Sequence, residues 1–116
     1  MDKFMKKIEA IIRIEKLDEV KKALEAEGFV GLTLTEVKGR GTQKGVNLEW
    51  RAGEYHVDFL PKLKVELVVD EFDSDRAIKV IIAAAQTGKI GDGKIFVSPV
   101  DNVIRVRTGE RGRKAL

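Results

Sequence analysis

The stretch that decides the fold runs from Asp73 to Val100 and reads DSDRAIKVIIAAAQTGKIGDGKIFVSPV. Its first part, 73–88, places apolar residues on one helical face and ends on a glycine, which predicts a helix. The apolar stripe of this helix consists of Ile78, Ile81, Ile82 and Ala85. Its last part, KIFVSPV at 94–100, has β-branched and aromatic residues and predicts a strand. The chain therefore passes from a helix through a glycine-rich turn into a strand.

The turn itself, TGKIGDGKIF from Thr87 to Phe96, almost matches a Walker A phosphate loop. Gly88, Gly93 and Lys94 supply the pattern G-x-x-x-x-G-K, but an isoleucine stands where the motif requires serine or threonine. A Walker A loop also runs from a strand into a helix, so that the phosphates meet the positive end of the helix dipole. Here the helix comes before the loop, and this order excludes a P-loop.

Two interpretations of the glycine turn remain. The glycines either only turn the chain from helix to strand, or they let the backbone approach an anion closely. Gly91, Asp92 and Gly93 are more than a simple connection needs, and lysines stand on both sides of them, at 89 and 94. The spacing leaves both interpretations open.

The rest of the chain repeats the same kind of unit. KKIEAIIRI at 6–14 predicts a strand, KLDEVKKALEAEG at 16–28 predicts a helix that stops at its glycine, and LTLTEVK at 32–38 predicts a second strand. KLKVELVV at 62–69 predicts the strand that precedes the second helix. This β-α-β, loop, β-α-β order predicts an α+β, ferredoxin-like domain over residues 1–116, with two helices on one face of an antiparallel sheet.

Two segments lie outside this duplicated unit. Residues 39–55 show no periodicity, and such a loop of about 17 residues is much longer than the usual two to six, which predicts a functional loop. NVIRVR at 102–107 predicts a short fifth strand with Arg105 and Arg107 on one face, where they are either solvated or neutralised by an anion. Residues 108–116 have no core-forming pattern and are expected to form a mobile tail.

Composition excludes several classes of protein. The 116 residues contain 43% hydrophobic and 35% charged residues and no cysteine, so a globular domain without disulfides or thiolate-bound metal is expected. No apolar run of about 18 residues and no signal-peptide pattern is present, which predicts a cytoplasmic protein with no membrane insertion. The net charge is only +3 and aromatic residues make up 6%, so no nucleic-acid partner is expected.

The second face of the sheet is expected to need cover. The apolar strand residues Ile8, Ala10, Ile12 and Val65 or Leu67 are expected to leave both sides of the sheet partly apolar. Large exposed apolar patches mark interaction surfaces, so we expect self-association.

Four segments, in this order, resemble the nitrogen-regulatory PII signal-transduction proteins. They are TEVKGRGTQKG at 35–45, EYHVDFLPKLKVE at 54–66, QTGKIGDGKIFV at 86–97 and VIRVRTGERG at 103–112. The resemblance extends from about Met5 to Leu116, and TGKIGDGKIF is among the most specific signatures of the family. Residues 39–55 correspond to the T-loop of the family, the glycine turn to its B-loop and the region of RTGERG to its C-loop.

The resemblance implies a homotrimer that binds ATP or ADP between subunits and has no catalytic residue. The nucleotide-binding positions that it implies are Ile11, Thr33, Gly39, Arg40, Gly41, Thr42, Val68, Thr87, Gly88, Gly91, Asp92, Gly93, Lys94, Arg105 and Arg107, the last two from the neighbouring subunit. It also implies that Gln43, Lys44, Gly45 and Lys62 bind 2-oxoglutarate, with Gln43 as a ligand of Mg²⁺. Binding of both ligands would set the conformation of the long loop, which controls protein targets such as an ammonium transporter or a nitrogen-assimilation enzyme.

Departures from the family pattern concentrate in this long loop. Thr42 stands where the family usually has an arginine, and Trp50 replaces a tyrosine. Tyr55 matches a tyrosine that some members have nucleotidylated, so it is a possible modification site. These changes keep an alternative open: a divergent PII-like nucleotide sensor with a different small-molecule effector.

Two other classes fit the same topology less well. An acylphosphatase-type enzyme needs an arginine in a phosphate loop after the first strand; Arg13 is in place, but no glycine-rich loop surrounds it. RNA recognition needs an aromatic RNP1 pattern, and KIFVSPV supplies only Phe96.

Overall fold

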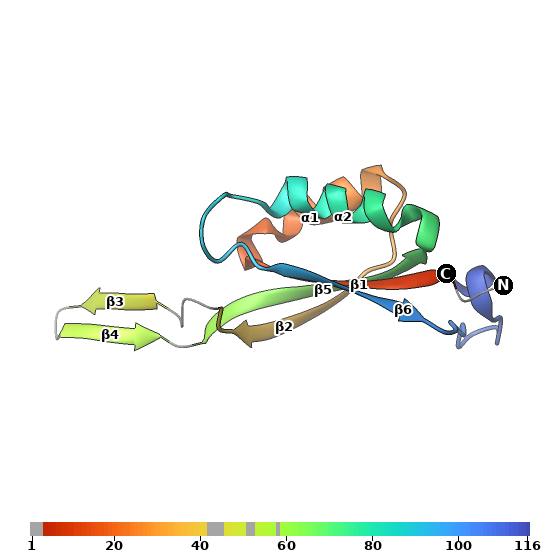
Figure 1. Ribbon diagram of the computed structural model, residues 1–116. Coiled ribbons are helices and arrows are strands. Elements are labelled where there is room, and N and C mark those ends of the chain that lie inside the picture. Colours follow the sequence, from red (N-terminus) through yellow and green to blue (C-terminus); the bar gives the residue numbers. More distant parts are fainter. Residues whose placement is uncertain (1–3, 42–45, 51–52, 58) are drawn as a thin grey trace.

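The computed structural model describes residues 4–41, 46–50, 53–57 and 59–116, and for 46–50 and 53–57 only the course of the backbone (Figure 1). Its elements are β1 (Met5–Ile12), η1 (Ile14–Lys16), α1 (Leu17–Ala26), β2 (Thr33–Gly39), β3 (Val46–Trp50), β4 (Gly53–Val57), β5 (Leu60–Asp70), α2 (Glu71–Ala85), β6 (Lys94–Val100) and η2 (Gly112–Ala115).

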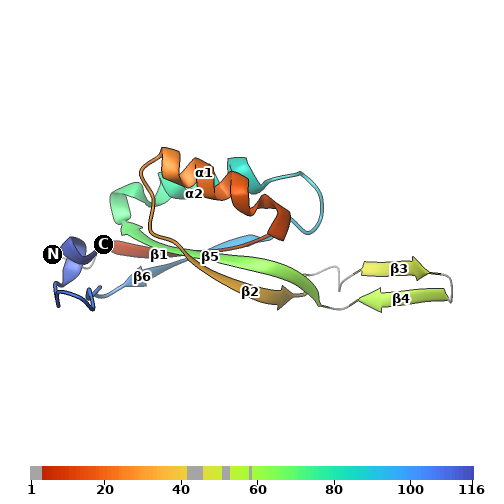
Figure 2. The same ribbon diagram turned by 180° about the vertical axis from the view of Figure 1, so that it is seen from behind.

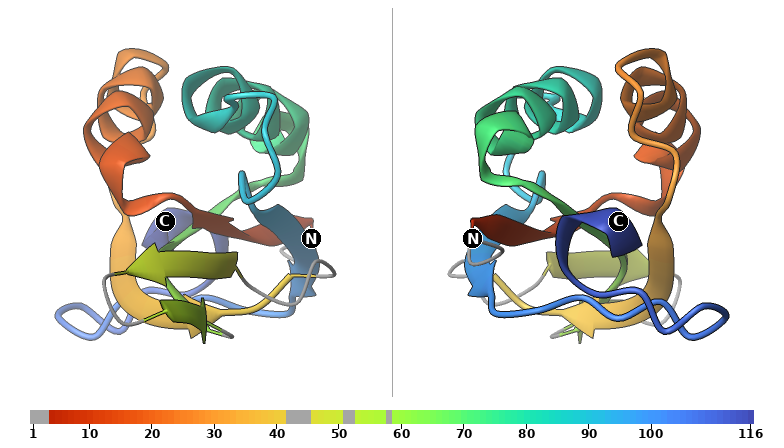
Figure 3. Two further views of the ribbon diagram at one scale, coloured as in Figure 1. Left: turned by 90° about the vertical axis from the view of Figure 1, so that its left-hand side faces the viewer. Right: turned by 90° about the vertical axis from the view of Figure 1, so that its right-hand side faces the viewer.

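The main sheet has four strands in the order β2-β5-β1-β6, and every neighbouring pair is antiparallel. Both helices lie side by side on one face of this sheet, as the end-on views of Figure 3 show. The antiparallel sheet with two helices on one face is thus confirmed. Since β1 and β5 are the central pair, the ends of these two strands are surrounded by the loops that carry the predicted site.

The α2 helix begins at Glu71, directly after β5 and two residues before its predicted start at 73. The side chain of Asp70 accepts a hydrogen bond from the backbone N–H of Phe72 at 3.1 Å, which satisfies one of the free donors of the first turn. The helix ends at Ala85, and Gln86 is already extended. The glycine turn then carries the chain back to β6 at the edge of the sheet.

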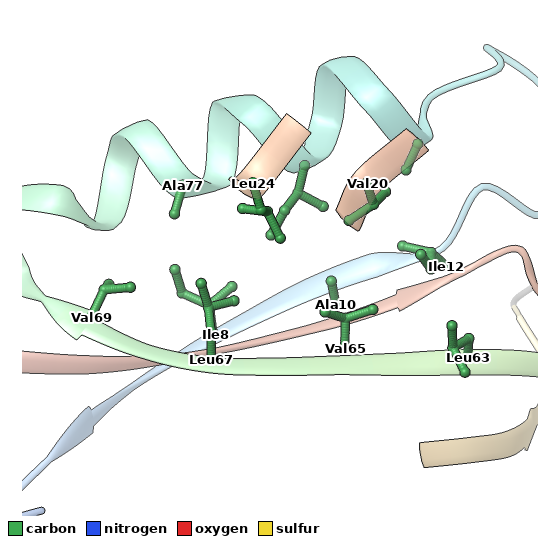
Figure 4. Packing of buried hydrophobic residues seen from close by; sticks show 12 residues of the cluster. Ile8, Ala10, Ile12, Val20, Leu24, Leu63, Val65, Leu67, Val69 and Ala77 are labelled. Atoms are coloured by element: carbon green, nitrogen blue, oxygen red, sulfur yellow. The ribbon is translucent and has the colours of Figure 1, made fainter. Parts of the chain in front are cut away.

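The core lies between the sheet and the helices (Figure 4). Along β5, Leu63, Val65, Leu67 and Val69 are buried, while the residues between them face the other side of the sheet. Ile8, Ala10 and Ile12 of β1 pair with three of these residues and point to the same face. On the helix side Val20, Leu24, Ala77, Ile81 and Ala85 complete the cluster.

This register corrects one prediction. All the strand residues that were expected to make both sides of the sheet apolar lie on the helix side, because each of them falls on the same phase of the strand alternation. The open face instead carries four charges. Lys7 Nζ lies 3.1 Å from Glu9 Oε1 and 3.5 Å from Glu66 Oε2, and Lys64 Nζ lies 3.8 Å from Glu9 Oε2 and 3.1 Å from Glu66 Oε1. These strand residues therefore do not make the open face apolar, but Phe96, which is opposite Glu9 and 55% exposed, does lie on it. The expected self-association stays a prediction.

The four side chains form a square of alternating charge on the open face. Glu9 and Glu66 are directly opposite in the β1–β5 ladder. Two like charges in this position destabilise a sheet unless neighbouring residues of opposite charge offset their repulsion. The hydrogen bond from Lys64 lowers the pKa of Glu66, and the hydrogen bond to Glu9 raises the pKa of Lys7. Each carboxylate thus has a lysine on either side of it, which offsets the repulsion between the two glutamates.

The long loop also differs from its prediction. Within residues 39–55, expected to be irregular throughout, the chain forms the β3–β4 hairpin, paired from Val46–Val57 to Trp50–Gly53. Figures 1 and 2 show this hairpin beyond the ends of β2 and β5, at the end of the molecule away from η2. The alternation of Val46, Leu48 and Trp50 with polar residues is the strand signal that the surrounding glycines obscured.

The C-terminal segment folds back on itself. Residues 102–107 do not form the expected fifth strand; they contribute one bridge, Ile104 to Arg111, because the turn around Gly109 (φ +73°) reverses the chain at once. Residues 108–116, expected to be a mobile tail, end in η2. Gly112 is buried and donates to Val103 O at 2.9 Å, and Arg113 Nε lies 3.0 Å from Asp70 Oδ2.

Candidate functional site

The glycine turn between α2 and β6 lies at the end of the sheet where β1 finishes (Figure 1). Gly88, Gly91 and Gly93 have φ values of +83°, +102° and +107°, a region that favours glycine. At Gly93 space matters as well, since a Cβ atom would lie 1.7 Å from the carbonyl oxygen of Ile11. Contact with β1 therefore requires this glycine, whether or not an anion approaches it.

Asp92 holds the turn together from inside. Its carboxylate accepts hydrogen bonds from the N–H of Thr87 at 2.8 Å, the hydroxyl of Thr87 at 2.5 Å and the N–H of Gly88 at 2.9 Å. These bonds, above all that from the Thr87 hydroxyl, hold the pKa of Asp92 well below its usual range. The carboxylate of Asp92 thus shapes the turn, and its negative charge is fixed at neutral pH.

We expect this carboxylate to make the turn sensitive to acid. Because the pKa of Asp92 is lower in the folded than in the unfolded chain, its contribution is complete above about pH 4 and is lost as the pH falls further, toward the folded pKa. Asp92→Asn should lower the melting temperature by a few degrees at pH 7. The difference in melting temperature between the variant and the parent protein should become smaller below about pH 4. Thermal unfolding of both proteins from pH 7 to pH 3 measures this; a constant difference would contradict it.

Two cations hold the same turn from outside. Arg13, just after β1, donates from Nε to Asp92 Oδ1 at 3.1 Å and from Nη2 to the carbonyl of Ile90 at 2.8 Å. Lys62 of β5 donates from Nζ to the carbonyl of Gly91. Burial lowers the pKa of Lys62, and the nearby charge of Arg13 lowers it further. Sequence reasoning missed this role of Arg13, since its partners are 77 and 79 residues away.

A cleft of about 330 Å³ opens beside the turn, between α2 and the edge of the sheet. Its walls are mostly apolar and belong to β1, α2 and β6. The polar groups at its margin include Gln86, Asp92 and Lys94. Four of the predicted nucleotide-binding residues meet here: Ile11, Asp92, Gly93 and Lys94. An apolar wall beside a glycine turn and an ammonium group is suited to a ligand with a flat apolar part and an anionic part.

Comparison with known proteins agrees with this arrangement. The family model described as "Nitrogen regulatory protein P-II" matches residues 5–110. The chain belongs to the nitrogen regulatory protein P-II family. It is 58% identical to Nitrogen regulatory protein P-II 2 of Methanothermobacter thermautotrophicus over 113 residues, which cover 97% of this chain and 98% of that protein. It is 60% identical to Nitrogen regulatory protein P-II of Nostoc punctiforme over 112 residues, or 97% and 100% of the two chains.

The fold is also that of a solved P-II structure. The crystal structure of Arabidopsis thaliana PII bound to citrate superposes with a TM-score of 0.81 at 43% sequence identity, covering 99% of this chain and 94% of that one. The relatives are named as regulatory proteins. In the described part of this P-II chain, no helix is long and apolar enough to cross a membrane, and no group of three or more His, Cys, Asp or Glu side chains is placed to hold a metal ion.

Some predicted residues of this P-II chain lie away from the turn. Val68 is opposite Lys7, and Thr33 is opposite Glu66, whereas the turn meets the sheet near Ile11. Both residues are on the open face of the sheet. Within one subunit they lie farther along the strands than the cleft.

Arg105 and Arg107 also lie far from the turn of their own subunit. They follow β6, which starts at the turn with Lys94 and spans seven residues, or about 20 Å, toward the opposite end of the sheet. Arg105 is engaged with Glu110 Oε1 at 3.2 Å and with the carbonyls of Lys114 and Leu116 at 3.3 and 3.2 Å. These arginines can meet a phosphate at a glycine turn only if the turn belongs to another subunit.

The long loop contains the other predicted residues. Gly39 ends β2, and a Cβ atom added to it would lie 3.8 Å from Cγ of Lys62. The guanidinium of Arg40 lies 5.5 Å from the centre of the Phe59 ring. Gly41 follows at the last described position before the gap. Thr42, Gln43, Lys44 and Gly45 lie outside the described residues, so the predicted Mg²⁺ ligand and most of the 2-oxoglutarate site stay predictions. The backbone of Tyr55 lies on β4, opposite Leu48.

Proposed function

We propose that this P-II chain is a signal-transduction regulator of nitrogen metabolism that senses ATP or ADP together with 2-oxoglutarate. The observation that carries the proposal is the glycine turn, held rigid by Asp92 and placed beside an apolar cleft with Lys94 at its margin. A turn of backbone N–H groups next to an ammonium group is suited to phosphate.

The nucleotide would lie between subunits of a homotrimer. Gly91, Gly93 and Lys94 would bind its phosphates, and Arg105 and Arg107 of the next subunit would add two more positive charges. The distance of these arginines from their own turn supports this arrangement. The remaining predicted contacts, from Thr33 and Val68 on the sheet to residues 39–42, belong to the nucleoside side of the same site.

The effector would lie next to the nucleotide. Mg²⁺ would be shared by the phosphates of ATP, Gln43 and the keto acid, whose second carboxylate would reach Lys62. The solved Arabidopsis relative contains citrate, another small polycarboxylate. Residues 39–55 would then report the ligand state to protein targets such as an ammonium transporter or a nitrogen-assimilation enzyme, in the cytoplasm and without a reaction of its own. Tyr55 is the candidate for covalent modification of this loop.

Calorimetric titration tests the proposal. We expect ATP with Mg²⁺ to bind the parent protein, and 2-oxoglutarate to bind only when ATP is present, since the two ligands share one metal ion. Lys94→Gln should weaken ATP binding about 10- to 100-fold, the usual effect of losing a hydrogen bond to a charged group. Lys79→Gln, on the exposed surface of α2, is the matched control and should leave the affinity unchanged.

Each other result has a distinct meaning. Nucleotide binding without any 2-oxoglutarate binding would favour the alternative, a divergent sensor with another effector. No nucleotide binding at all would overturn the proposal. Light scattering on the same samples tests the trimer, whose mass would be three times the 13.0 kDa of one chain.

A further inference from the structure

The hydrogen bonds of the glycine turn divide its N–H groups into two sets. Those of Thr87 and Gly88 point inward to Asp92, and that of Lys89 donates to the hydroxyl of Thr87 at 3.1 Å. The N–H groups of Gly91 and the residue after it have no acceptor within the described part of the chain. The N–H groups of Gly91 and Asp92 are therefore available to a ligand.

The direction of these two N–H groups is fixed through the carbonyl oxygens of the same peptide groups. All peptide bonds of the described residues are trans, so each N–H points opposite to the carbonyl of the preceding residue. The carbonyl of Ile90 is held by Arg13, and that of Gly91 by Lys62. The N–H groups of Gly91 and Asp92 must therefore point away from these two cations.

We propose that Arg13 and Lys62 are positioning residues for the phosphates of the nucleotide, because they set the direction of the two N–H groups that would bind them. Lys62 would have a second role. Its ammonium group has three donors, so it can hold the Gly91 carbonyl and a carboxylate of the keto acid at the same time. This inference rests on the proposed function and adds the physical link between its two sites.

The link explains why the coupling should be positive. A carboxylate bound to Lys62 restrains the ammonium group, which in turn keeps the Gly91 carbonyl turned toward β5 and the N–H of Asp92 toward the phosphates. By thermodynamic reciprocity, a nucleotide that holds the turn in this conformation favours the carboxylate by the same factor. No movement of a whole element is needed.

The test is ATP binding in the absence of any keto acid. If Lys62 only bound the effector, Lys62→Met would leave this affinity unchanged. We expect Lys62→Met and Arg13→Gln each to weaken ATP binding about 5- to 10-fold, the order of a typical coupling between sites. Lys62→Arg, which keeps a donor for the Gly91 carbonyl, should restore most of the affinity. Lys16→Met, which removes the ion pair with Glu19 and no bond to the turn, is the control.

Nuclear magnetic resonance supplies a readout that does not depend on affinity. The amide signals of Gly91 and Asp92 should shift in ligand-free Lys62→Met, while signals from α1 stay in place and show that the variant is folded. Unchanged ATP affinity in Lys62→Met would overturn this inference and leave the proposed function standing. If the parent protein bound no ATP, both would fall.

Discussion

Gly93→Ala is expected to lower the free energy of unfolding by at least about 3 kcal/mol. The added Cβ would lie 1.7 Å from the carbonyl oxygen and 2.8 Å from the carbonyl carbon of Ile11. These are backbone atoms of the central strand, and the next residue, Lys94, is the one that pairs with Ile11. The clash can be relieved only by separating β6 from β1 at the turn.

Gly88→Ala is the matched control for this prediction. Gly88 has a similar backbone angle, φ +83°, but nothing lies within 4 Å of an added Cβ. It should cost about 1 kcal/mol, the usual penalty for a side chain in the left-handed region. Urea denaturation of both variants at one protein concentration measures the difference, since the stability of an oligomer depends on concentration. Equal losses in the two variants would show that β1 tolerates the methyl group.

Ile8→Ala is expected to lower the free energy of unfolding by about 3 kcal/mol, within the range for large-to-small changes in a core. Ile8 is fully buried at the middle of β1, under the two helices. It is not among the residues that line the cleft and lies farther along β1 from the turn, so the folded fraction should keep its affinity for ATP. Urea denaturation and calorimetry on the same sample measure the two quantities.

Ile11→Ala, on the same strand, should have a small effect on stability and a larger effect on ATP binding. Ile11 is only half-buried and lines the cleft beside the turn. Its truncation should cost about 1 kcal/mol of stability, because only part of the side chain leaves water on folding, but it should weaken ATP binding. A loss of ATP affinity in Ile8→Ala as large as in Ile11→Ala would mean that contact with the cleft does not decide the contribution of a β1 residue to nucleotide binding.

Much of the fold follows from periodicity in the sequence. The two helices and the four main strands were predictable because each buries one regular face, and the β-α-β duplication then restricts the topology. The face of each strand residue was not predicted correctly, since that requires the register. Ile8, Ala10 and Ile12 share one phase along β1, and the pairing with β5 puts all three under the helices.

The site was predictable in its composition but not in its internal contacts. The glycines and Lys94 stand out in the sequence because glycine next to lysine has a physical meaning for anions. The β1 contact that requires Gly93 is made across 82 residues of chain, between 11 and 93, and no local pattern reports it. The bonds from Arg13 to the turn are equally remote in sequence. Long-range contacts of this kind depend on the sheet order.

The square of alternating charge on the open face has a consequence for how this sequence can change over evolution. Reversing the charge of any one of Lys7, Glu9, Lys64 or Glu66 would leave three like charges and one opposite charge in the square, whereas exchanging a lysine with its neighbouring glutamate on the same strand would keep the square neutral. The effects of substitutions at positions in such close contact are not additive. Lineages that descend from this protein should therefore replace these residues in compensating pairs, so that the four positions are inherited as one unit.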